Sequence, residues 1–279
     1  MVKDDRKPLL ELRDIDISFG FVDALKSATL SIYRQEIVAI VGDNGAGKST
    51  LVKIIAGLLQ PDSGTILYRN APVVIPSIKV ADEMGIASVF QGQEFCDNLD
   101  VASNLFLGKE LTYHGKRDDA SMLGKARTVL KSLGSAISVR SPISSLSMGQ
   151  RQTVAVARTL LNDPALILLD EPTASLSVIQ TAEVLSTIKR LRSEGRSIVM
   201  VCHDLPDVFS IADRIIVLRQ GHISGIHCVT DTSYEEIIAE IAGVAIKNTH
   251  ENTPNNTKYQ NLIRQRKLIS RVICEKIQE

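Results

Sequence analysis

The chain has 279 residues, 44% of them hydrophobic, with 32 acidic and 32 basic side chains and a formal net charge of zero. That length allows one large domain or two small ones, and the hydrophobic content is enough for a substantial core. A neutral balance disfavours nucleic acid as a partner, because phosphate backbones are bound by an excess of basic residues.

The N-terminus and the cysteines indicate an intracellular protein. The first eight residues are charged and lack an apolar core, so we expect no secretory signal. No apolar run approaches the roughly 18 residues that span a bilayer. The cysteines lack C-x-x-C spacing, which is typical of reduced thiols in a cytosol, and they stand at Cys96, Cys202, Cys228 and Cys274.

Short apolar segments predict strands, in chain order, at residues 9–19, 28–33, 36–41, 86–90, 165–169, 197–201 and 214–218. Helical stretches alternate with the later strands, which indicates an α/β protein with a largely parallel sheet covered on both faces. Between about residues 97 and 150 the strand pattern vanishes, and residues 125–133 have helical periodicity. We therefore expect a helical insertion in the α/β core there.

Towards the C-terminus the composition changes. Residues 248–258 are rich in Asn and Thr, as in a solvated linker. Residues 262–277 place apolar side chains near one helical face, opposite basic residues. This helix either packs on its own domain or frays, or it docks on a partner or a membrane surface. We expect one domain at residues 1–246, followed by a polar linker and a helix at 247–279.

A glycine-rich loop follows the third predicted strand and precedes a helix. It reads G-x-x-x-x-G-K-[ST], the pattern of a phosphate-binding loop in its proper context. The loop consists of Gly42, Asp43, Asn44, Gly45, Ala46, Gly47, Lys48, Ser49 and Thr50. Its backbone N–H groups and the helix N-terminus favour phosphate, Lys48 would reach the β/γ oxygens, and Ser49 would ligate Mg²⁺. The loop predicts binding of ATP or another nucleoside triphosphate with Mg²⁺.

Two adjacent carboxylates, Asp170 and Glu171, end the buried strand at residues 165–169. The carboxyl end of such a strand lies at the phosphate-binding edge of a parallel sheet. Asp170 can therefore hold Mg²⁺ together with Ser49, and Glu171 can orient and polarise the attacking water. The alternative is a solvated strand end before the turn at Pro172.

Gln91 and His203 also follow predicted strands. The Gln91 amide could contact both the Mg²⁺ shell and the nucleophilic water, and His203 could donate to the γ-phosphate. Taken alone, a loop glutamine is uninformative and a histidine at this place is more often a plain surface residue.

Residues 146–152 read L-S-M-G-Q-R-Q, which resembles the L-S-G-G-Q signature of ATP-binding-cassette (ABC) ATPases. The order of the phosphate loop, Gln91, this signature, the Asp-Glu pair and His203 is also the order in that family, and the likeness covers about residues 9–245. The resemblance implies a P-loop NTPase (RecA-like) core with a parallel-rich sheet, an antiparallel N-terminal β part and a helical signature subdomain.

Position by position, the resemblance implies that Ser49, Gln91 and Asp170 form the Mg²⁺ shell. Glu171 corresponds to the catalytic carboxylate and His203 to the switch histidine, with Gln91 beside the reacting water.

The resemblance also implies contacts to the base and across a dimer. Phe19 matches the aromatic residue that stacks on adenine, although ordinary core packing at a strand end is the alternative. Two cassettes pair head to tail in this family. Ser147, Gly149 and Gln150 of one copy would close over the γ-phosphate held by the other, so we expect a homodimer.

Two segments resemble carbohydrate importers for ribose, xylose and fructose. One is residues 96–110, and the other is residues 170–177, where Ser177 replaces the aspartate of most cassettes. The resemblance implies an ATPase peripheral to the cytoplasmic face of the membrane. It would work with permease subunits and indirectly with a sugar-binding protein.

Two positions depart from the family pattern. Met148 replaces the first signature glycine and would crowd the closing interface, while Gln35 replaces the glycine usual before Glu36. Met148 leaves open a regulatory cassette that binds ATP without turnover. A soluble ATPase of translation or DNA repair is the third alternative, which the neutral charge and the lack of long insertions disfavour.

Overall fold

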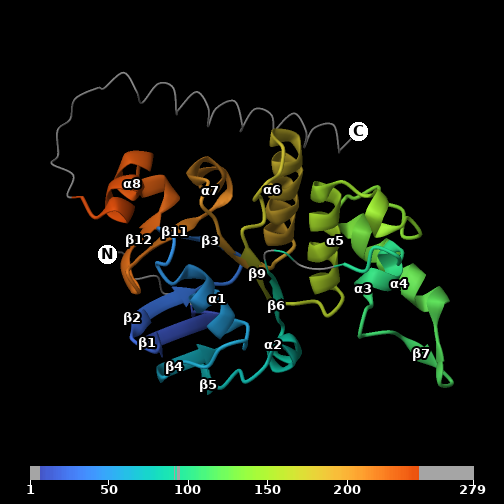
Figure 1. Ribbon diagram of the computed structural model, residues 1–279, viewed down its shortest axis with the longest axis horizontal. Helices are drawn as coiled ribbons and strands as arrows, with labels where there is room; N and C mark the ends of the chain where they lie inside the picture. Colours follow the sequence, from blue (N-terminus) through green and yellow to red (C-terminus); the bar gives the residue numbers. More distant parts are fainter. Residues whose placement is uncertain (1–6, 91, 93–94, 245–279) are drawn as a thin grey trace.

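The computed structural model describes residues 7–90, 92 and 95–244, which form two larger β-sheets, a two-stranded hairpin and a group of helices (Figure 1). The larger sheet has the strand order β12-β11-β3-β10-β9-β6, and only β12 runs antiparallel to its neighbour. Its strands are β3 (Ile37–Val41), β6 (Ile86–Val89), β9 (Leu166–Asp170), β10 (Ser197–Val201), β11 (Arg214–Arg219) and β12 (His222–Cys228). The predicted α/β class is confirmed.

The smaller sheet is antiparallel and comes from the N-terminal part of the chain. Its order is β2-β1-β4-β5. The strands are β1 (Leu10–Phe19), β2 (Val22–Ile32), β4 (Ser63–Tyr68) and β5 (Ala71–Val73). Figure 1 shows this sheet below the larger one, with the first helix between them.

Eight helices among the described residues pack on the larger sheet or on one another. They are α1 (Lys48–Ile55), α2 (Ile78–Met84), α3 (Val101–Leu105), α4 (Asp119–Ser132), α5 (Met148–Leu160), α6 (Val178–Ser193), α7 (Leu205–Ile211) and α8 (Tyr234–Ala242). Two short 3-10 turns are η1 (Ile143–Ser145) and η2 (Val229–Asp231). None of the helices in the described part of the chain is long and apolar enough to cross a bilayer.

The apolar strands of the larger sheet supply two hydrophobic cores. In β3, Ile37, Ala39 and Val41 join a cluster that includes residues of α3 to α8. Val38 and Ile40 point to the other face and join α1 and the antiparallel sheet. Each fully buried aliphatic side chain contributes about 1.5–3 kcal/mol. This burial on both faces explains why the strand is apolar throughout instead of alternating.

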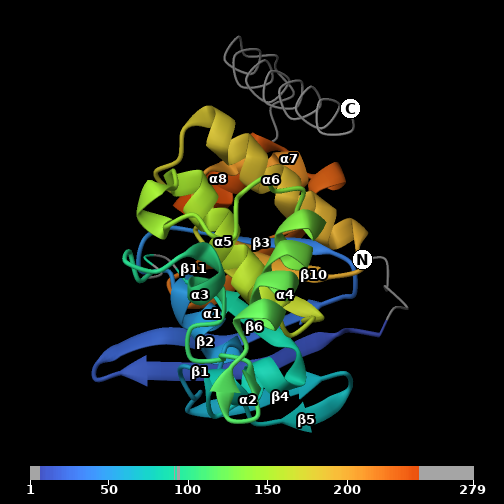
Figure 2. The same ribbon diagram turned by 90° about the vertical axis from the view of Figure 1, so that its right-hand side faces the viewer.

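The insertion predicted for residues 97–150 contains α3, α4, η1 and the start of α5. The expectation that it lacks strands is wrong, because β7 (Thr112–Tyr113) and β8 (Lys116–Arg117) form a small hairpin. His114 and Gly115, the two residues between them, both have positive φ, the conformation of a tight hairpin turn. Figure 1 shows the insertion to the right of the larger sheet, and in Figure 2 the insertion faces the viewer.

The segment at 247–279, predicted as a linker and helix, lies outside the described residues. The limits of the predicted domains stay a prediction.

Candidate functional site

The strand order β3-β10-β9 brings three chain segments together. Val201 of β10 pairs with Ile40 of β3 on one side and with Asp170 of β9 on the other, all in parallel. Parallel strands end at the same edge of a sheet. The loop after β3, the segment with His203 after β10 and the residues after β9 therefore meet there. These are three of the segments that the sequence singles out.

The loop after β3 requires glycine at two points for steric reasons. Gly42 has φ 149° and Gly47 has φ 104°, conformations that L side chains rarely adopt. A Cβ at Gly42 would lie 2.0 Å from the Leu218 carbonyl oxygen, and one at Gly47 would lie 2.4 Å from that of Ala24. Gly45 has φ 80° but open space around it, so only its backbone conformation favours glycine there.

Lys48 lies inside this loop. Its side chain is buried, and Nζ donates to the carbonyl oxygens of Gly42 at 2.9 Å and Asp43 at 2.8 Å. Burial lowers the pKa of Lys48, while the negative charges of Glu171, Asp43 and Asp170 oppose that shift. A buried ammonium group held by carbonyl dipoles is well placed to exchange those carbonyls for phosphate oxygens.

Asp170 ends β9 and is buried. Burial and the adjacent charge of Glu171 raise the pKa of Asp170, whereas a hydrogen bond from Ser49 and the charges of Lys53 and Lys48 lower it. Its Oδ1 atom is buried without a hydrogen-bond partner among the described residues. An orphaned carboxylate oxygen beside a hydroxyl is an arrangement that a divalent cation would complete.

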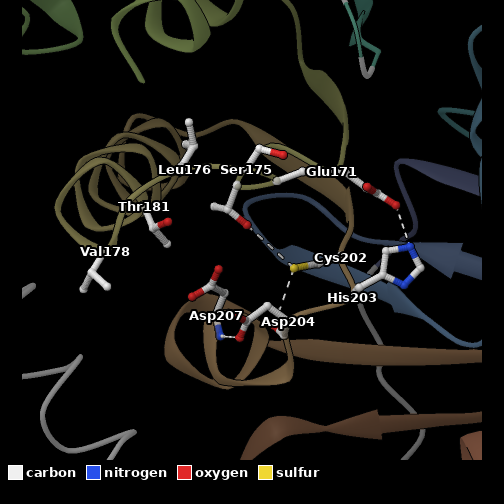
Figure 3. A pocket seen from close by; sticks show the side chains of 11 residues that line it. Glu171, Ser175, Leu176, Val178, Thr181, Cys202, His203, Asp204 and Asp207 are labelled. Carbon is white, nitrogen blue, oxygen red and sulfur yellow. Dashed lines mark hydrogen bonds and ion pairs between the residues drawn. The ribbon is translucent and has the colours of Figure 1, made fainter. Parts of the chain in front are cut away.

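Glu171 and His203 face each other across the edge of the sheet (Figure 3). Glu171 Oε1 lies 2.5 Å from His203 Nε2. The main chain of Glu171 has φ 52°, and its N–H donates to the carbonyl oxygen of Val201 at 3.0 Å. A non-glycine residue in this region is strained, and such strain is characteristic of functional sites.

Two cavities flank His203. The first, of about 270 Å³, is lined by residues after β9 and β10, with Glu171 and His203 at one end (Figure 3). The second, of about 220 Å³, lies against Gly42, Asp43 and Asn44 of the loop after β3. His203 and Cys202 therefore line both cavities, one against the glycine-rich loop and one against the segment that follows Glu171.

The sequence predicted no function for the buried residues of the first cavity. Cys202 lies between the cavities, and burial raises its pKa to about 12, which makes its thiol unreactive. Its Sγ donates to the Asp204 carbonyl oxygen at 3.5 Å and lies 4.0 Å from Thr173 Oγ1. Asp207 is also buried in this cavity. Only the position of Cys202 directly before His203 could have drawn attention to it.

The signature-like residues form the start of α5. Ser147 is the N-cap: its hydroxyl accepts from the N–H of Gln150, and the Gln150 side chain accepts from the N–H of Ser147. Gly149 is buried against Gln180 of α6, while Met148 is 59% exposed. In this structure these residues contact their own chain, and Met148 projects from it.

The remaining predicted residues differ in their exposure, and one of them is not described by the structure. Phe19 pairs with Val22 across the turn that joins β1 and β2, and it is 49% exposed, so it is not ordinary core. Ala46 is buried, whereas Ser49 and Thr50 are half-buried at the start of α1. Gln91 lies outside the described residues.

Comparisons with known proteins support one family. A model of the ABC transporter family matches residues 25–174. The chain is 37% identical to the xylose/arabinose import ATP-binding protein XylG of Sulfolobus acidocaldarius, over 85% of this chain and 95% of that one. It is 39% identical to the ribose import ATP-binding protein RbsA 2 of Escherichia coli O157:H7, over 78% of this chain and 43% of that one.

A solved structure supports the same family. The chain matches the dimeric structure of MJ0796, a bacterial ABC transporter cassette, with a TM-score of 0.66 and 28% identity, over 79% of this chain and 98% of the other. The fold and the site therefore define a P-loop nucleotide-binding cassette. The chain belongs to the ABC transporter family, as its motifs predict. It spans about half the length of most of the curated relatives that it matches.

Proposed function

We propose that this chain is the ATP-hydrolysing subunit of a transporter that imports a sugar. The family match and the names of its relatives support this assignment. The observation that carries it is the buried Asp170 with an unpartnered oxygen, next to Ser49 and near the charge of Lys48. This arrangement suits the phosphates of ATP with their Mg²⁺ ion.

The residues present fit Mg²⁺. Ser49 and Asp170 would hold it, and Gln91 is the third proposed ligand. Bound there, the ion would neutralise phosphate charge during transfer. Phe19 would stack on the adenine, and the N–H groups of the loop at residues 42–50 would surround the β- and γ-phosphates.

Glu171 and His203 would act on the reacting water and the γ-phosphate. Glu171 can accept a proton from the water, and its contact with His203 fixes the direction of the carboxylate. His203 contacts Glu171 and lines a cavity together with the glycine-rich loop, where a donor can stabilise charge on the γ-phosphate.

Turnover would require a second copy of the chain. We propose that Ser147, Gly149 and Gln150 of one cassette cover the nucleotide of the other in a head-to-tail homodimer. A relative of similar fold has been solved as a dimer, which supports this arrangement. The dimer would act at the cytoplasmic face of the membrane with permease subunits that receive sugar from a binding protein.

Steady-state hydrolysis of Mg-ATP by the purified chain tests the proposal. The blank is Glu171→Gln, which keeps the shape of the side chain and removes its charge. Wild-type turnover clearly above the blank supports the ATPase. Turnover equal to the blank, both alone and with the permease present, would contradict it.

Met148 favours a second candidate, a regulatory cassette that binds ATP without turnover. Its exposed side chain lies at the first position of α5, where the related signature has glycine, so it would meet whatever docks on Ser147. Met148→Gly separates the two functions. If only this variant hydrolyses ATP, the regulatory cassette is the better assignment. If the wild type does so equally well, Met148 is tolerated.

A further inference from the structure

The helices α5 and α6 start at the same edge of the larger sheet. Helix α5 ends shortly before β9 begins, and α6 ends shortly before β10 begins. Because β9 and β10 are parallel neighbours, their first residues lie at one edge and the helix starts lie near the other. Figure 1 shows the two helices side by side. The start of α6 and the start of α5 thus both lie towards the edge that carries Glu171.

Both helices begin with the same capping device. In α6, the Ser177 hydroxyl accepts from the N–H of Gln180, and the Gln180 side chain accepts from the N–H of Ser177 at 3.1 Å. This reciprocal pair satisfies two backbone donors and fixes where the helix starts. Ser177 is also the last residue of the segment that begins at Glu171.

Gln180 has a second contact, with the start of α5. A Cβ placed on Gly149 would lie 3.0 Å from both Cβ and Cγ of Gln180. The Cβ atom is fixed by the Gln180 backbone, and moving the Cγ atom would require another side-chain rotamer, so a side chain at position 149 would crowd both atoms. Within one chain, the Gln180 side chain therefore packs where a side chain at position 149 would lie. This requirement for glycine holds whatever Gly149 contacts in a dimer.

We propose that Gln180 is a positioning residue that couples the signature segment to the Glu171 segment of its own chain. Its amide oxygen holds Ser177, and its aliphatic carbons hold Gly149. The start of α5 and the residues between Glu171 and Ser177 then shift as one unit when a second copy closes. This role rests on the proposed function, because it concerns the approach of these two segments to a shared nucleotide.

The variants Gln180→Ala and Gln180→Glu test the coupling. Alanine removes both the cap oxygen and the Cγ that covers Gly149, whereas glutamate keeps the acceptor and the carbon chain. We expect Gln180→Ala to lower kcat by roughly tenfold, since small misplacements of reacting groups are costly. We expect Gln180→Glu to stay within about twofold of the wild type, and the affinity of the single chain for ATP to be unchanged in both.

Glu236→Ala is the matched control. Glu236 occupies the same position in the capping pair with Ser233 at the start of α8. It should lower thermal stability about as much as Gln180→Ala does and leave kcat unchanged. If Gln180→Ala keeps the wild-type kcat, or if Glu236→Ala loses as much, the coupling role is wrong. A wild-type chain that neither binds nor hydrolyses ATP would instead overturn the proposed function, so the two failures are distinguishable.

Discussion

The carboxylate of Glu171 lies 2.5 Å from Nε2 of His203, although the two residues belong to segments after different strands. The backbone of Glu171 is tied to the Val201 carbonyl oxygen, two residues before His203. The side-chain contact is thus supported by a main-chain contact between the same two segments. A change of either side chain would leave the main-chain hydrogen bond without a direct loss of its donor or acceptor.

The first prediction concerns these two side chains. Glu171→Gln should lower kcat by about 100-fold or more, because a general base contributes roughly that factor. His203→Ala should lower it by about tenfold or more through loss of a donor to the phosphate. Both should keep the affinity for ATP, which equilibrium titration of a fluorescent nucleotide measures.

The control for these variants is His114→Ala, in the turn between β7 and β8. It should leave kcat unchanged. Equal losses in His203→Ala and His114→Ala would show that the effect on hydrolysis is not specific to the site.

The second prediction compares two glycines of one loop. Gly47→Ala combines a strained φ with overlap against the Ala24 carbonyl oxygen, which belongs to the backbone and cannot move aside. Gly45→Ala meets only the strain, on the order of 1 kcal/mol. We expect Gly47→Ala to lose nucleotide binding and several degrees of thermal stability, and Gly45→Ala to lose far less stability. Equal melting temperatures for the two variants would contradict this account.

The elements that the sequence predicts well are those with continuous apolar runs. The strand at 197–201 has the predicted limits, β3, β6 and β11 differ from their predictions by one residue at one end, and β9 is shifted by one residue at both ends. These strands are buried on both faces, so their apolar content is uninterrupted. Strands β4, β5 and β12 were not predicted. In β12 exposed residues alternate with half-buried ones and Gly225 interrupts the run, so pairing with β11 defines the strand.

The sequence predicts which residues of the site follow which strands, but it does not predict the contacts that these residues make. Strand ends carry Asp170, Glu171 and His203 to one edge by topology alone. The contacts of Lys48 with two carbonyl oxygens and of Gly149 with Gln180 depend on loops and helices that approach in three dimensions. No local pattern encodes such contacts.

The third prediction concerns Gln35, where the family pattern has glycine. Gln35 has φ 57°, its N–H donates to Ser197 Oγ at 3.1 Å, and its carbonyl oxygen accepts from Arg192. Because these contacts use only the backbone, Gln35→Gly should keep them and relieve the strain. We expect a gain of about 1 kcal/mol in the free energy of unfolding.

Urea unfolding measures this gain, with Gln35→Ala as the control. Alanine retains the strained φ and should bring no gain. A Gln35→Gly variant no more stable than Gln35→Ala would mean that the turn is not strained.

The last prediction tests a proposal that the permease docks on the segment from Phe95 to Leu99, which begins the helical insertion. Asn104 is fully buried and holds the base of this segment: its side chain accepts from the N–H of Cys96 and donates to the carbonyl oxygens of Cys96 and Leu99. The Arg158 guanidinium also lies 5.1 Å from the centre of the Phe95 ring.

Asp97 of this segment is the residue to change. Its side chain is largely exposed and forms an ion pair of 3.3 Å with Arg151, an exposed contact worth at most about 1 kcal/mol. Asp97→Lys should therefore leave folding and basal ATPase activity within about twofold of the wild type while it disturbs the surface offered to a permease. We expect sugar uptake by vesicles that contain the complete transporter to fall and hydrolysis to continue.

The control is Lys79→Glu on α2, which reverses the charge of a residue in an exposed ion pair with Glu83. Asp118→Lys, another charge reversal in the insertion, would be a poor control because Asp118 caps α4. Normal uptake with Asp97→Lys, or an equal loss with Lys79→Glu, would place the docking surface elsewhere.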